Sequence, residues 1–275
     1  MRVDILESSG FCGGVNRAIK MLDDMVEKSE NKTIYLLGEI VHNKSVNDEY
    51  INKGCKIINE DDLDNLNDGD IVISSAHGIS NKLKDKLKRF NHVDTTCPFV
   101  KKNQDRIFKD DSKNIFFIGK NGHSEAIALT TDKSIPIIEN VDDIFKYDLS
   151  NGVSYCQTTF SLEKLQKIES KIKSINPNFK FYNTLCEVTI KNQNALLNVD
   201  KRYNKLIIVG DKHSNNALSL YEMSKYETTY FISDEHEIDN HDFNKDDNIL
   251  IIGSASTPKK VMTTIKDYIL SKIDK

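Results

Sequence analysis

Three cysteines stand at equivalent positions of a repeated pattern, and this repeat constrains the fold more than any other feature of the chain. Cys12, Cys97 and Cys186 are separated by 85 and 89 residues. Each is followed by an amphipathic helical stretch, a short apolar strand (IYLLG, IFFIG or LIIVG) and a polar loop. Further on, each repeat has an apolar strand ending in SAHG, QTTF or SAST and then a helix. A period of this size indicates one α/β unit per repeat rather than a solenoid.

Short apolar strands that alternate with amphipathic helices predict parallel strands in small layered sheets. We therefore expect an α/β fold of three small α/β domains, formed by residues 13–96, 97–185, and 186–275 together with 1–12. We expect the N-terminal strand to belong to the last domain, because the third repeat otherwise lacks its final strand. We expect a pseudo-threefold axis to relate the domains, so that loops at the carboxyl ends of their strands meet at the centre.

Composition excludes several classes of function. The chain has 275 residues and a net charge of −4, without a Lys/Arg run that would indicate a nucleic-acid partner. Its apolar runs are too short to span a membrane, and its N-terminus lacks a signal-peptide core. We expect a cytoplasmic protein, in which cysteines stay reduced. Cys55 and Cys156 have no counterpart in the other repeats and are expected to be core residues.

The three repeated cysteines are candidate metal ligands. Each lies at a helix N-terminus, where the helix dipole favours a thiolate. A single cysteine is usually a packed core residue, but a shared repeat position argues against that role for all three. Zinc would need a fourth ligand, and neither the close-spaced pairs of structural zinc sites nor ferredoxin spacing is present. Three thiolates from three domains suit an iron–sulfur cluster with one iron left open for substrate.

The other loops bring hydrogen-bond donors to the same expected centre. Helix N-termini, hydroxyl groups and imidazoles together form an anion site, and a diphosphate is its natural occupant. A single histidine in a chain with seven is ordinarily a surface or structural residue. Three at strand-end loops of a repeat favour binding instead. The candidate donors are His42, His77, His123, Thr158, Thr159, Ser214, Asn216 and Ser256.

Glu125 is the only carboxylate in this set of loop residues, and its pattern permits two interpretations. Among anionic groups, its pKa would be raised and it could relay protons. Alternatively, Ser124 and Glu125 simply begin a helix in the segment SEAIAL.

Seven motifs in fixed order resemble the hydroxymethylbutenyl diphosphate reductases, the last enzymes of the non-mevalonate isoprenoid pathway. The motifs are GFCGGVNRA, VHN, SAHG, TCP, GHSE, QTT and SAST-P, and the resemblance covers essentially the whole chain. It implies three α/β domains around a central 4Fe–4S cluster with three cysteine ligands, Cys12, Cys97 and Cys186. It also implies reductive dehydroxylation of 4-hydroxy-3-methylbut-2-enyl diphosphate to isopentenyl and dimethylallyl diphosphate.

The resemblance assigns roles to further residues. Glu125 delivers protons and Thr158 positions it. A ferredoxin or flavodoxin supplies the electrons. The substrate diphosphate is held by His42, His77, His123, Ser214, Asn215, Asn216 and Ser256. Two positions depart from the family pattern: Ser124 stands where proline is frequent, and Asn215 stands where the family has a second serine.

Two other functions fit the same outline of three units, a thiolate triad and an anion pocket. Quinolinate synthase also sets an open-iron cluster among three α/β domains, for a dehydrative condensation, but SAHG and GHSE favour the reductases. A non-enzymatic sensor of phosphorylated metabolites would have no need of Glu125.

Overall fold

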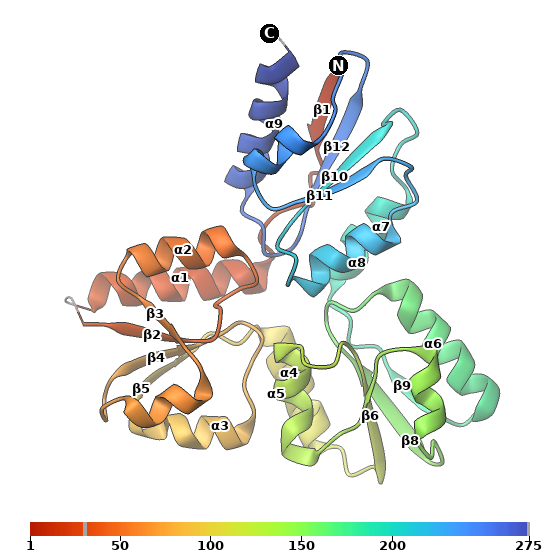
Figure 1. Ribbon diagram of the computed structural model, residues 1–275. Coiled ribbons are helices and arrows are strands. Elements are labelled where there is room, and N and C mark those ends of the chain that lie inside the picture. Colours follow the sequence, from red (N-terminus) through yellow and green to blue (C-terminus); the bar gives the residue numbers. More distant parts are fainter. Residues whose placement is uncertain (30–31, 274–275) are drawn as a thin grey trace. The chain divides into compact units, whose positions relative to one another are not determined.

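The computed structural model describes residues 1–29 and 32–273, which form three four-stranded parallel sheets (Figure 1). The expected α/β class with small parallel sheets is confirmed. The chain divides into two compact units, one of residues 1–12 and 186–275 and the other of residues 13–185. The further division of the larger unit at residues 96 and 97 stays a prediction.

The larger unit holds two of the sheets. The first has the strand order β3-β2-β4-β5, with α1 and α2 on one side and α3 on the other (Figure 1). Its elements are α1 (Gly13–Lys28), β2 (Ile34–Leu37), α2 (Lys44–Asn52), β3 (Lys56–Ile58), β4 (Ile71–Ser74), α3 (Asn81–Lys86) and β5 (Asn91–Asp94). The second sheet has the order β7-β6-β8-β9. Its elements are α4 (Pro98–Lys109), β6 (Asn114–Ile118), α5 (Ser124–Thr130), β7 (Ile137–Ile138), β8 (Gly152–Cys156), α6 (Leu162–Ile175) and β9 (Lys180–Tyr182).

The smaller unit holds the third sheet, in the order β1-β12-β10-β11. β1 (Arg2–Ile5) pairs in parallel with β12, so the first strand of the chain completes the sheet of the last repeat, as the repeat predicts. The other elements are α7 (Glu187–Leu197), β10 (Lys205–Val209), α8 (Asn215–Met223), β11 (Thr229–Ile232), β12 (Asn248–Gly253) and α9 (Lys259–Ile273).

The same elements recur in the same order in all three sheets. A backbone hydrogen bond recurs with them: the N–H of Gly38, Gly119 or Gly210 donates to a carbonyl of the neighbouring edge strand at 2.9–3.1 Å. At Gly210, an added Cβ would lie 2.5 Å from the Cβ of Ala217 on α8. Only glycine therefore lets α8 begin so close to the end of β10.

The central strands are buried, and the polar loops follow them. Every residue of β4 and β8 is buried, as expected for parallel strands covered on both faces. The helices that follow β2, β6 and β10 have the N-caps Asn43, His123 and Ser214, whose side chains accept from backbone N–H groups. Strand ends and helix starts thus hold the candidate site residues in defined backbone positions.

None of the helices in residues 1–29 and 32–273 has the length and apolar character needed to cross a membrane.

Candidate active site

A carboxyl group in the larger unit is both buried and hydrogen-bonded. Glu125 is the second residue of α5 and is only 1% exposed. Thr158, in the loop after β8, donates to it twice: its N–H to Oε1 at 2.8 Å and its hydroxyl to Oε2 at 2.6 Å. The N–H of Glu125 donates to Nδ1 of His123 at 3.1 Å, so Glu125 does begin a helix. The two interpretations of Glu125 are therefore compatible.

Burial raises the pKa of Glu125 to about 7, while the two hydrogen bonds from Thr158 act to lower it. The pattern of loop residues predicts that neighbouring anions raise the pKa of Glu125. That cause is wrong for this structure, where removal of the carboxylate from water is the largest effect. A carboxyl group with a pKa near neutrality can hold and release a proton at working pH.

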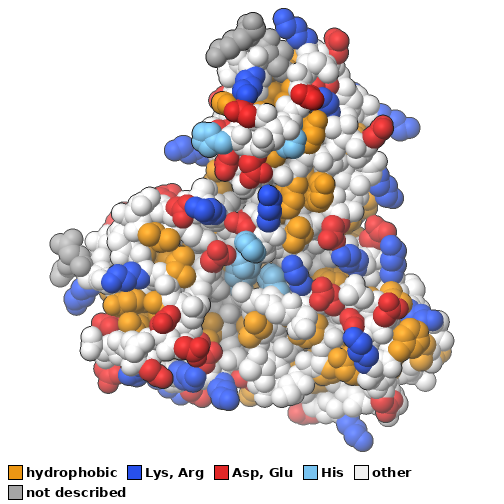
Figure 2. All heavy atoms as spheres, in the orientation of Figure 1, with side chains coloured by type: hydrophobic (Ala, Val, Ile, Leu, Met, Phe, Trp, Pro, Cys, Tyr) orange, Lys and Arg blue, Asp and Glu red, His pale blue; other side chains and the backbone are white. Residues whose placement is uncertain are grey.

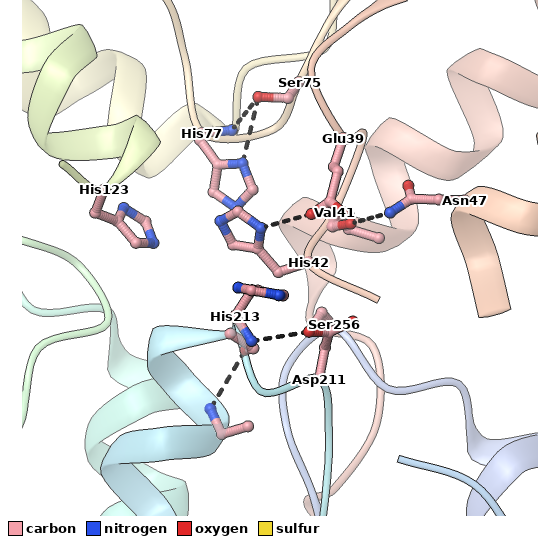
Figure 3. A network of polar contacts seen from close by, with 12 residues as sticks. Glu39, Val41, His42, Asn47, Ser75, His77, His123, Asp211, His213 and Ser256 are labelled. Atoms are coloured by element: carbon pink, nitrogen blue, oxygen red, sulfur yellow. Dashed lines mark hydrogen bonds and ion pairs between the residues drawn. The ribbon is translucent and has the colours of Figure 1, made fainter. Parts of the chain in front are cut away.

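Three imidazoles cluster in the same unit (Figure 3). The rings of His42 and His77 are stacked with their centroids 4.2 Å apart, and the ring of His123 lies edge-on at 5.3 and 5.5 Å from them. Nδ1 of His42 is 3.0 Å from a carboxylate oxygen of Glu39, and Nδ1 of His77 is 3.3 Å from the hydroxyl of Ser75. The contacts with Glu39 and Ser75 orient the rings of His42 and His77.

The electrostatics of the cluster favour neutral imidazoles at His77 and His123. Burial is the largest cause lowering the pKa of His77 well below its ordinary value and that of His123 to about 3, and the charge on His42 adds to both shifts. A neutral imidazole has one N–H donor and one lone pair. The three rings have ligand atoms within 4.8 Å of one another, close enough to consider a metal ion. The N–H groups of the same rings can instead donate to an anion.

A buried glutamine that was not predicted from the sequence links two segments of this site by hydrogen bonds. Gln104, on α4 and 5% exposed, donates through Nε2 to the carbonyls of Ile79 (2.8 Å) and Ala128 (3.1 Å). Ile79 lies two residues after His77, and Ala128 lies on α5 with Glu125. One side chain thereby links the two segments. A Cys-x5-Asn-Gln pattern after both Cys97 and Cys186 was the available signal.

Each repeated cysteine immediately precedes a helix. Cys97 is the N-cap of α4 and Cys186 that of α7, while α1 begins one residue after Cys12. The N–H of Cys97 donates to the carbonyl of Ala76 at 3.0 Å, and that of Cys12 donates to Ala255 at 3.1 Å. All three cysteines are partly exposed.

The cysteines outside the repeat are buried. Cys55 is 4% exposed and Cys156 is 2% exposed, which confirms them as core residues. Arg17, on α1, donates through Nη1 to the carbonyl of Thr96 at 3.2 Å. It therefore supports the backbone directly before Cys97.

The smaller unit gathers the remaining candidates around the loop after β12. Ser214 caps α8, and Asn215 and Asn216 are its first two residues. Oδ1 of Asn216 accepts from the N–H of Ala255 at 2.9 Å, while its buried Nδ2 has no partner within the described part of the chain. The hydroxyl of Ser256 is 3.1 Å from that of Ser254. A buried donor without a partner fits an anion site.

The structure thus brings together His42, His77 and His123 in one unit, and Ser214, Asn215, Asn216 and Ser256 in the other. Cys97, Glu125 and Thr158 belong to the larger unit, and Cys12 and Cys186 to the smaller. The roles of these residues stay predictions.

A protein with this fold and these groups belongs to the α/β enzymes that bind an anionic substrate and move protons near neutral pH. Comparison with known proteins narrows the class. The family model described as LytB protein matches residues 3–270. The chain belongs to the LytB family.

Full-length relatives support the same family assignment. The 4-hydroxy-3-methylbut-2-enyl diphosphate reductase of Thermoanaerobacter sp. (strain X514) is 33% identical, covering 96% of this chain and 95% of the relative. That of Clostridioides difficile (strain 630) is 31% identical, covering 98% and 99%. The solved E-1-hydroxy-2-methyl-but-2-enyl-4-diphosphate reductase from Plasmodium falciparum has a TM-score of 0.87 at 28% identity, covering 97% of this chain and 87% of that chain. A second solved (E)-4-hydroxy-3-methyl-but-2-enyl diphosphate reductase has a TM-score of 0.68 at 26% identity, covering 98% and 100%.

The family resemblance drawn from the sequence motifs is therefore confirmed, and the chain is an oxidoreductase of this family. These findings leave the quinolinate-synthase-like alternative without support. Members of the family carry a 4Fe–4S cluster.

Proposed function

We propose that the chain reduces 4-hydroxy-3-methylbut-2-enyl diphosphate to isopentenyl and dimethylallyl diphosphate. The substrate takes up two electrons and two protons, its hydroxyl leaves as water, and the remaining proton adds to the allylic carbon chain. The observation that carries the proposal is Glu125: a carboxyl 1% exposed, with a pKa of about 7, in the same unit as three clustered imidazoles.

The diphosphate is the part of the substrate that these residues bind. His42, His77 and His123 offer imidazole N–H donors. Ser214, Asn215, Asn216 and Ser256 add hydroxyl and amide donors at the start of α8 and in the loop after β12. The start of α8 also offers the positive end of its dipole to the anion.

Cys12, Cys97 and Cys186 are the proposed ligands of the 4Fe–4S cluster. Three partly exposed thiols at helix starts fit this group, whereas the buried Cys55 and Cys156 do not. When bound, the cluster supplies electrons and a Lewis-acidic iron. The cytoplasmic location expected from the sequence would keep these thiols reduced.

Glu125 holds the proton that the reaction consumes. At pH 7 its protonated and ionised forms are both populated, because its pKa is about 7. Thr158 fixes the carboxyl through two hydrogen bonds and keeps its pKa from rising further. A ferredoxin or flavodoxin is the proposed source of the electrons.

Thr158 is expected to set the pH at which the reaction slows. Thr158→Val removes the hydroxyl that donates to the carboxylate, so the ionised form loses a partner and the pKa of Glu125 rises. The alkaline limb of the kcat profile then moves to higher pH, by on the order of one unit. Thr158→Ser keeps the hydroxyl and is the matched control. If the alkaline limb of the kcat profile is unchanged in Thr158→Val, the ionisation of Glu125 does not determine that limb.

The proposed function is tested by anaerobic turnover of the reconstituted chain. With reduced methyl viologen as the electron source, loss of the allylic alcohol diphosphate should be accompanied by formation of the two isomeric products. Electron paramagnetic resonance of the reduced chain should change when substrate is added. A sensor would give the spectral change without products, and that result would reject the enzyme.

A further inference from the structure

The outer face of α4 differs from an ordinary solvated helix face. Val100, Asn103, Gln104 and Ile107 point inward and are buried. All other residues of the helix are exposed. Among them, Lys101, Lys102, Arg106 and Lys109 are basic and Asp105 is the only acid. We call these four cations the α4 basic face.

Its charges stabilise the isolated helix only in part, although Arg106 and Lys109 lie in the last turn, where the helix dipole favours cations. The first turn of α4 contains no acidic residue, although the N-terminal end of a helix dipole favours anions. Lys102 and Arg106 stand four residues apart, a spacing at which like charges repel. Lys101 has an exposed ion pair with Asp94 at 3.4 Å, but Lys102, Arg106 and Lys109 have no ion-pair partner within the described residues. Such local conflict is characteristic of functional surfaces.

The same face carries apolar groups and a shallow groove. Phe99 is 48% exposed and Phe108 is 56% exposed, and in the helical projection they border the basic face on opposite sides. A groove of about 350 Å³ is lined by Pro98, Lys101, Lys102, Asp105, Arg106 and Lys109. Exposed aromatic rings among cations are a composition common in protein–protein interfaces.

The α4 basic face is opposite in sign to the chain as a whole, whose net charge is −4. On the face of the molecule seen in Figure 2, basic and acidic side chains are interspersed. A local excess of three positive charges on one exposed helix attracts an anionic partner and raises its rate of encounter.

The helix begins at a proposed cluster ligand. Cys97 caps α4, and a rise of about 1.5 Å per residue puts Lys101 and Lys102 only about one turn further along the helix. A protein bound there lies close to the sulfur of Cys97. Electrons from a protein donor must enter near the cluster, so this surface suits their delivery.

We infer that the α4 basic face, with Phe99 and Phe108 at its borders, is the docking surface for an acidic electron-carrier protein. The inference rests on the proposed function, since it assumes that Cys97 ligates the cluster. Carboxylates of the carrier pair with Lys101, Lys102, Arg106 and Lys109, and apolar groups at the edges of its contact surface cover the phenylalanine rings.

The test compares two double charge reversals on the cluster-loaded chain. One is Lys102→Glu with Arg106→Glu on α4. The other is Lys167→Glu with Lys173→Glu, two exposed lysines on α6, and it makes the same change in net charge. Substrate turnover is measured anaerobically with reduced flavodoxin, with reduced ferredoxin, and with reduced methyl viologen as a small donor that needs no docking surface.

We expect the α4 reversal to raise both the Kd for the oxidised carrier, measured by calorimetry, and the KM for the better protein donor by about tenfold or more, with the viologen rate within about twofold of the wild type. The wild-type rate with the protein donor should fall as NaCl rises from about 20 to about 300 mM, and the α4 variant should lose this dependence. Equal rates for the two reversals would overturn the inference, as would loss of the viologen rate in the α4 variant alone. A wild-type chain that reduces substrate with viologen but with neither protein donor would also overturn it. Failure of the wild type with all three donors would reject the proposed function itself.

Discussion

Glu125→Gln is expected to lower kcat by about two to four orders of magnitude, the range that a positioned general acid contributes. The amide has nearly the shape of the carboxyl and can still exchange hydrogen bonds with both donors of Thr158, whose hydroxyl also accepts. It has no proton to release near neutral pH. Binding of inorganic diphosphate, measured by calorimetry on the same preparation, should stay within about twofold, because the amide adds no charge to the anion site.

Glu169→Gln is the matched control for this prediction. Glu169 on α6 also has a pKa raised by burial, but it is not among the residues proposed for the reaction. Its replacement should leave turnover unchanged. Wild-type turnover in Glu125→Gln would exclude Glu125 as the proton donor. Loss of diphosphate binding as well would indicate a structural role instead.

Cys97→Ser is expected to abolish the cluster and the activity with it. A neutral hydroxyl is a poor ligand for iron compared with a thiolate, so iron after anaerobic reconstitution should fall from about four per chain to well below one. Turnover should fall by at least about a hundredfold. Iron analysis and the visible absorption of the cluster report this loss independently of activity.

Cys55→Ser is the corresponding control, because Cys55 is a buried cysteine outside the repeat. It should keep its iron and turnover and instead lose about 1–3 kcal/mol of unfolding free energy, the cost of burying a hydroxyl without a partner. Full iron content in Cys97→Ser would falsify the proposed ligand set.

The fold could be predicted from the sequence because its signals are local. Short apolar runs gave the strands, and amphipathic periodicity gave the helices. The threefold recurrence then implied parallel sheets and the return of the first strand to the last one, where β1 pairs with β12. Capping is equally local: Ser161 directly precedes α6, and its hydroxyl accepts from Lys164 N–H at 3.3 Å.

Part of the candidate site could also be predicted from the sequence. Glycine-rich turns and polar loops after strands identified His42, His77 and His123, and the structure brings them together. Gln104 was missed because a glutamine within an amphipathic helix carries no local sign of its partners. Its two acceptors lie 25 and 24 residues away along the chain.

The sequence by itself determined the α/β class, the order of the elements, and which residue types stand at strand ends and helix starts, because these depend on neighbours along the chain. Only the tertiary structure decided that two histidine rings stack, that Gln104 bridges two loops, and that burial rather than nearby anions brings the pKa of Glu125 to about 7. The reason is physical: a pKa depends on how much water and which dipoles surround the group, and Thr158, which holds that carboxyl, lies 33 residues further along the chain.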